Sequence, residues 1–60
     1  MSTAADNFMR GAEMARRLAD EYRRDAQKPE TPSTLKAKWI DEANRADERA
    51  EWYEQHARIM

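Results

Sequence analysis

The sequence predicts an all-α protein, an antiparallel two-helix hairpin with an alanine-rich, coiled-coil-like seam. The 60-residue chain has one glycine and two prolines, and 38% of its residues are charged, which is typical of amphipathic helices. Both prolines lie near the middle of the chain, where they predict a single break. On either side of that break, apolar residues recur at alternating steps of three and four, which places them along one face of a helix.

A chain of this length is expected to form one domain over residues 1–60. We expect a helix over about 4–27, a loop over about 28–32 and a second helix over about 33–59. Thr3 and Asp6 approximate a capping box at the start of the first helix. Pro29 disfavours helix in the residue before it, and Thr31 or Ser33 is expected to cap the second helix.

Each predicted helix carries an unbroken apolar seam. In the first helix it comprises Ala5, Phe8, Ala12, Ala15, Ala19, Tyr22 and Ala26, and in the second Trp39, Ala43, Ala46, Ala50, Tyr53, Ala57 and Met60. In an antiparallel hairpin the numbers of facing residues must add to a nearly constant value, and these pairs add to 61 or 62. The register therefore predicts three central layers of alanine, closed by Phe8 with Tyr53 at one end and Tyr22 with Trp39 at the other.

Charged residues on the outer faces are spaced to support the same helices. Five acidic residues precede an arginine by four positions: Asp6–Arg10, Glu13–Arg17, Asp20–Arg24, Asp41–Arg45 and Glu54–Arg58. Such pairs stabilise a helix without any functional role. The formal net charge of −1 provides no overall attraction to nucleic acid or to an anionic membrane.

The alanine seam leaves little apolar surface to bury, so the monomer is expected to be marginally stable. A second copy or a partner protein would then complete the fold, and we expect a homodimer in the form of a four-helix bundle. The candidate protein interface is one flank of the seam: Gly11, Met14, Leu18, Trp52, His56 and Ile59. Gly11 lowers helix propensity, which suggests the close approach of another group, and Trp52 is the candidate for that group.

The opposite flank of the seam is mainly charged. It carries Arg16, Arg23, Asp47 and Glu54, and it is interrupted by Met9 and Ile40. This contrast favours the flank that contains Met14 as the binding surface.

No residue pattern indicates catalysis. His56 is the only histidine, and no acidic residue lies one helical turn away on its face of the helix. The seam carries no carboxylate for a di-iron site, the chain has no cysteine, and one glycine cannot form a phosphate-binding loop. We therefore expect no catalytic, metal-binding or cofactor-binding residues, no cofactor and no small-molecule substrate.

An alternative hypothesis is that the chain forms a hairpin dimer that binds nucleic acid. Residues 16–38 hold seven basic residues against four acidic ones, concentrated toward the tip of the hairpin: Arg16, Arg17, Arg23, Arg24, Lys28, Lys36 and Lys38. Such a tip could contact phosphates. A further alternative is a structural subunit that packs permanently against other chains of a larger assembly.

The sequence thus favours a non-enzymatic adaptor or inhibitor that self-associates and binds or blocks a protein partner. No apolar run is long enough to serve as a signal peptide or to span a membrane. We expect a cytoplasmic protein with no role at a membrane.

Overall fold

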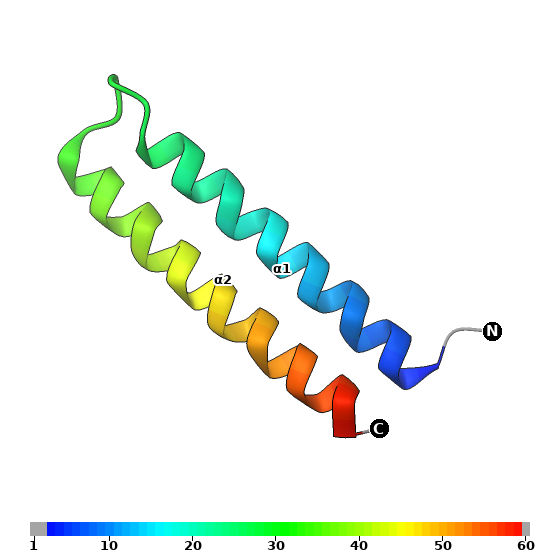
Figure 1. Ribbon diagram of the computed structural model, residues 1–60. Coiled ribbons are helices and arrows are strands. Elements are labelled where there is room, and N and C mark those ends of the chain that lie inside the picture. The colour runs from blue at the N-terminus through cyan, green and yellow to red at the C-terminus, as the bar shows by residue number, and fades with distance from the viewer. Residues whose placement is uncertain (1–2, 60) are drawn as a thin grey trace.

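The protein is an all-helical hairpin in the computed structural model, which describes residues 3–59 (Figure 1). Helix α1 runs over Ala4–Ala26 and helix α2 over Ser33–Ile59. The two helices lie side by side and antiparallel, so the start of α1 and the end of α2 share one end of a rod. Its Cα extents are 44 × 17 × 9 Å, and the hairpin predicted from the apolar spacing is confirmed.

The predicted capping box begins α1. The Thr3 hydroxyl oxygen accepts a hydrogen bond from the Asp6 amide at 3.1 Å, and the Thr3 amide donates to the Asp6 carboxylate at 3.3 Å. These two bonds satisfy amides that have no partner inside the helix. The carboxylate of Asp6 also lies at the positive end of the helix dipole.

The connection between the helices differs from the prediction in the role of Thr31. Its hydroxyl donates to the backbone carbonyl of Asp25 at 2.7 Å, so it serves the end of α1 and does not cap α2. The Pro32 carbonyl accepts the first helical bond of α2, from the Lys36 amide at 2.9 Å, which places Pro32 in the capping position. Ser33 is already the first residue of the helix. Proline lacks an amide, so it cannot leave an unpaired donor at this position.

The core lies along the seam and consists of alanine. One cluster joins Ala12 and Ala15 to Ala50, and a second joins Ala19 to Ala43 and Ala46. These groupings agree with the predicted pairs Ala12–Ala50 and Ala19–Ala43, whereas Ala15 and Ala46, also predicted to face each other, belong to different clusters. Ala26 is the seventh buried residue of the described chain, and Met60 lies outside the described residues.

Aromatic side chains close the seam differently at its two ends. At the end with the termini, the rings of Phe8 and Tyr53 lie 5.9 Å apart, as the register predicts. At the loop end, Tyr22 packs against the second alanine cluster and Trp39 is half-buried, but within residues 3–59 ring-to-ring contacts occur only at the terminal end. The predicted layer of Tyr22 with Trp39 thus includes no ring contact in the described part of the chain.

Candidate protein interface

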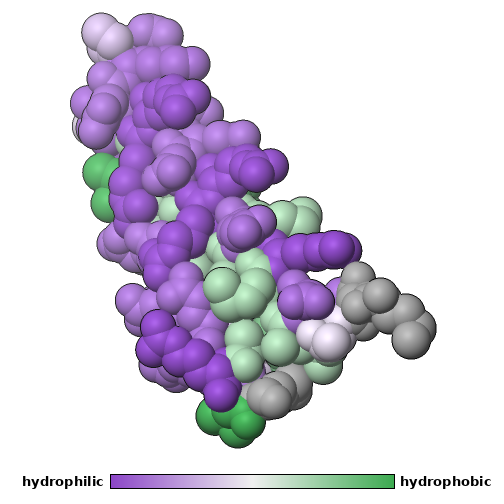
Figure 2. Space-filling model, turned by 45° about the vertical axis from the view of Figure 1, so that its right-hand side comes forward, coloured by the Kyte–Doolittle hydropathy of each residue, from purple (hydrophilic) through white to green (hydrophobic). Residues whose placement is uncertain are grey.

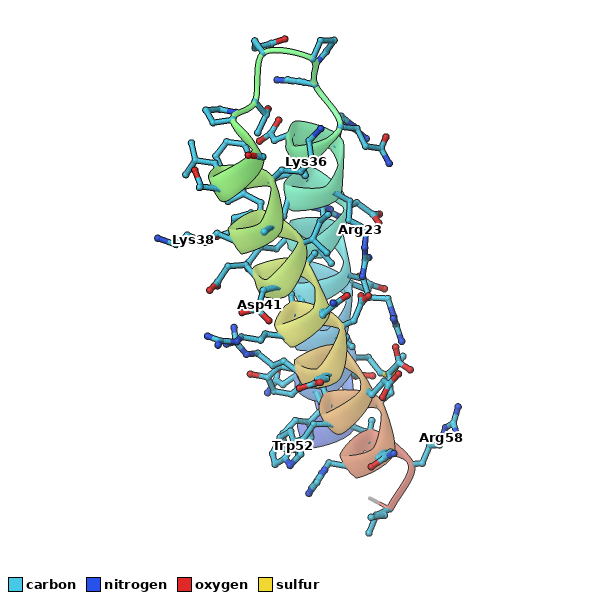
Figure 3. All side chains as sticks on the ribbon, turned by 90° about the vertical axis from the view of Figure 1, so that its left-hand side faces the viewer. Arg23, Lys36, Lys38, Asp41, Trp52 and Arg58 are labelled. Atoms are coloured by element: carbon cyan, nitrogen blue, oxygen red, sulfur yellow. The ribbon has the colours of Figure 1, made fainter. Side chains whose placement is uncertain are left out.

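The hairpin has two broad faces, one on each side of the seam. We call one the Met14 face, defined by Gly11, Met14, Leu18, Trp52, His56 and Ile59. We call the other the ion-pair face, defined by Arg16, Arg23, Asp47 and Glu54. Figure 3, which views α2 from outside, shows Trp52 pointing to one side and Arg23 and Arg58 to the other.

The ion-pair face joins the two helices by charge. Arg16 contacts one Glu54 carboxylate oxygen through Nε and through Nη2, each at 3.0 Å, and lies 3.5 Å from Asp47. The Arg23 guanidinium donates to the same Asp47 carboxylate and, at 3.3 Å, to Asn44. The charges on this face therefore satisfy one another within the chain.

The spacing of four residues predicted only some of these ion pairs. Among the five expected pairs, Asp41 and Arg45 form a contact at 3.2 Å. Glu54 turns instead to Arg16 on the neighbouring helix. In the part of the chain that the structure describes, the remaining three pairs, Asp6–Arg10, Glu13–Arg17 and Asp20–Arg24, show no contact within 4 Å.

The Met14 face exposes large apolar side chains. Met14 is 69% exposed, Ile59 81% and Trp52 48%, and Leu18 is also exposed. Leu35 belongs to this face because it lies three heptads before His56, and it is exposed as well. Figure 2 views the molecule from the other side, over the outer surface of α1 and the ion-pair face; in that view hydrophobic side chains lie toward the end that carries the termini, and hydrophilic ones dominate the loop half.

A shallow groove of about 400 Å³ runs over the middle of the Met14 face. It is lined by Gly11, Met14, Ala15, Arg17, Leu18, Glu21, Arg49 and Tyr53. The groove thus joins three residues predicted for the interface, Gly11, Met14 and Leu18, to one acidic and two basic side chains that were not predicted for it. Heptad spacing could have found Arg49, because it lies one heptad before His56.

The group that approaches Gly11 is Tyr53, and the expectation of Trp52 is wrong. A β-carbon at Gly11 would lie 3.2 Å from two ring carbons of Tyr53. Tyr53 occupies a seam position of α2 and therefore faces α1. Trp52, the preceding residue, lies outside the seam on the Met14 face. Gly11 therefore has a packing role inside the hairpin.

Trp52 and His56 form a stacked pair at the terminal end of the Met14 face. Their ring centroids lie 3.8 Å apart at an interplanar angle of 25°. The His56 Nδ1 lies 2.8 Å from the Trp52 carbonyl oxygen, and it donates the hydrogen bond because a carbonyl can only accept. Phe8 packs against Trp52 in a T-shaped arrangement with ring centroids 5.8 Å apart, and Trp52 remains 48% exposed.

The seven basic residues near the tip do not gather on one surface. Arg16 and Arg23 are paired with carboxylates of α2, and Lys28 contacts Asp25 at 3.1 Å. Lys38 points to the opposite side of α2 from Arg23 (Figure 3). The remaining three are Arg17, Arg24 and Lys36.

Over residues 3–59, no group of three histidine or acidic side chains is arranged to hold a metal ion. Neither helix, over the same residues, combines the length and the apolar character needed to span a bilayer.

Comparisons of the chain with protein-family models, with curated proteins and with solved structures find no match. The function is therefore inferred from the geometry of the two faces.

Proposed function

We propose that this chain is a non-enzymatic protein-interaction module that self-associates through the Met14 face, as a small adaptor or inhibitor that binds or blocks a protein partner. One observation carries the proposal. Of the seven large apolar side chains that are exposed in the described chain, five lie on the Met14 face: Met14, Leu18, Leu35, Trp52 and Ile59. Met9 and Ile40 share the heptad positions of the ion-pair face.

The composition of the core supports association. Alanine is the only residue type that is buried within residues 3–59, and an alanine side chain contributes little apolar area. Most of the larger apolar side chains therefore remain available to a second molecule. Burying each of them stabilises a complex by about 25 cal/mol per Å² of apolar surface removed from water.

The dimensions of the hairpin suit a face-to-face dimer. The broad face measures 44 × 17 Å between Cα atoms, or about 750 Å². A stable interface of ordinary size buries about 800 Å² on each partner. One whole face of the hairpin therefore has the area that such an interface needs.

The ion-pair face suits the solvent-exposed side of such a dimer. Arg16, Arg23, Asp47 and Glu54 already neutralise one another across the two helices. Burying them against a partner would add a cost of desolvation without a new counter-charge. The nucleic-acid alternative has less support, because three of its seven basic residues are paired with carboxylates.

The test is sedimentation equilibrium of the full chain over a dilution series, with helicity followed by circular dichroism on the same samples. The variant L18E/W52E places two charges on the Met14 face. Its matched control, M9E/I40E, places two charges at exposed apolar positions of the other face.

The proposal predicts a dimer for the wild type and for M9E/I40E, and a monomer of reduced helicity for L18E/W52E. Equal solution masses for the two variants would overturn the assignment of the interface. A wild type that stays monomeric and fully helical at every concentration would overturn self-association.

A further inference from the structure

We infer that the partner on the Met14 face is a second copy of this chain, related by a two-fold axis perpendicular to the helices, with Arg49 of each copy paired to Glu42 of the other. The inference deepens the proposed self-association and rests on it. In this arrangement α1 packs on α1 of the second copy, and α2 on α2, both antiparallel.

The charge pattern of α2 supports this axis. Glu42 and Arg49 are one heptad apart, so they share a position beside the seam on the Met14 face. Their separation along the helix is about 10.5 Å at 1.5 Å per residue, so they do not pair with each other within one chain. Within the chain, the Glu42 carboxylate lies 3.6 Å from Arg45. A two-fold axis level with the midpoint of residues 45 and 46 places Glu42 of one copy beside Arg49 of the other. Because the axis repeats each contact, the dimer contains two such pairs of opposite charge.

The apolar pattern of α1 supports the same axis. Met14 and Leu18 are exposed and one turn apart on the same face. Rotation about an axis at residue 16 places Met14 of one copy against Leu18 of the other. The contact is apolar on both sides and also occurs twice.

The midpoint of Glu42 and Arg49 on α2 and the midpoint of Met14 and Leu18 on α1 lie at the same level along the hairpin. The alanine clusters set Ala12 level with Ala50 and Ala19 level with Ala43, so residue 16 of α1 lies level with residues 45 and 46 of α2. The charge pair and the apolar pair, found on different helices, therefore require one and the same axis. That axis also brings Lys38 of one copy to the exposed indole of Trp52 of the other, a cation–π contact.

A two-fold axis parallel to the helices would pair the charged and apolar side chains of the two copies less favourably. It would lay α1 of one copy over α2 of the other at the same level, because a rotation about the long direction does not move residues along it. By the register of the alanine clusters, Glu42 and Arg49 would then lie level with residues 20 and 13 of the second copy, within two positions of Leu18 and Met14. Charged side chains would be desolvated against apolar ones, which is unfavourable.

The test is a charge-swap cycle on the full chain: R49E, E42R and the double variant, each studied by sedimentation equilibrium at low salt. In the dimer of either single variant, residues 42 and 49 of the two copies carry like charges at both symmetry-related contacts. Each single variant is therefore expected to raise the dimer dissociation constant about tenfold. The double variant restores opposite charges and is expected to return to within about threefold of the wild type. Salt near 1 M should reduce these differences, because exposed charges are screened.

Matched controls reverse charges on the outer edges of the helices. E48R and R24E change exposed residues outside both broad faces, and they are expected to leave the dissociation constant within about twofold of the wild type. R49E is expected to keep the helix intact, because the new carboxylate lies four residues after Arg45.

A disulfide experiment tests the apolar pair independently, since the natural chain has no cysteine. In an equimolar mixture of M14C and L18C under mild oxidation, random pairing would give as much mixed disulfide dimer as the two symmetric dimers together, and the inferred axis predicts that the mixed dimer exceeds their sum. A yield of the mixed dimer at or below the sum of the two symmetric dimers would overturn the axis.

The outcomes separate this inference from the proposed function. A dimer in which neither single charge reversal weakens association would overturn the inferred axis and leave self-association intact. A wild type without any dimer would overturn both. Recovery by the double variant, together with the mixed disulfide, would support the axis.

Discussion

Tyr53 covers Gly11 so closely that a β-carbon at position 11 would lie 3.2 Å from two carbons of the phenol ring. The ring is itself held between neighbours, with Phe8 at 5.9 Å and Trp52 at 5.4 Å between centroids. Glycine thus allows α2 to place a large ring directly on the backbone of α1. The helix loses about 0.8–1 kcal/mol relative to alanine in return for this contact.

Gly11→Ala is therefore expected to raise the free energy of unfolding by less than about 0.5 kcal/mol in the wild type, because crowding against Tyr53 opposes the gain in helix propensity. In a Tyr53→Leu background the ring is absent, and the same change should give about 1 kcal/mol. Urea unfolding of the wild type, the two single variants and the double variant at one chain concentration measures the difference. An equal gain in both backgrounds would show that the ring does not restrict position 11.

Asp47 joins two arginines of α1 and should contribute more to stability than an acid on the outer surface. Asp47→Asn is expected to lower the free energy of unfolding by about 1 kcal/mol, since both ion pairs cross between the helices and its side chain is only 28% exposed. The matched variant Asp41→Asn removes one contact of a 60% exposed carboxylate and should cost about 0.3 kcal/mol. Thermal unfolding at low salt and near 1 M salt checks both values. Equal effects would contradict the role of Asp47 between the helices.

The hydroxyl of Thr31 stabilises the end of α1 by bonding the Asp25 carbonyl. Thr31→Val keeps the shape of the side chain, removes the donor and is expected to cost about 1 kcal/mol. Ser33→Ala is the control, because Ser33 lies inside the first turn of α2, and it should cost less than about 0.5 kcal/mol. If Ser33 proved the more sensitive position, the assignment of Pro32 as the cap of α2 would be wrong.

The central alanines hold the helices close together. Ala43→Leu is expected to destabilise the hairpin by about 3 kcal/mol or more, because Ala43 is completely buried against Ala19 and the added atoms have no space. Ala37→Leu makes the same chemical change at an exposed position of α2 and should stay within about 0.5 kcal/mol of the wild type. Circular dichroism during urea unfolding checks both. A tolerated Ala43→Leu would mean that the seam can open.

The local features of this protein could be predicted from the sequence because each depends on residues a few positions apart. The capping box of Thr3 with Asp6 is an example, since its two partners are three residues apart in the chain. The seam and its register follow in the same way from the spacing of alanines such as Ala19 and Ala43. These features determined where the helices run and which sides face each other.

The tertiary structure decided which partner each side chain takes. Glu54 had Arg58 available one turn away, yet it contacts Arg16 across the seam. Thr31 serves Asp25 of the preceding helix, and Tyr53 rather than Trp52 covers Gly11. Spacing along one helix identifies a face, but the choice between a partner on the same helix and one on the neighbouring helix depends on how closely the backbones approach. Here small alanine side chains bring the helices together, and long side chains such as arginine reach across.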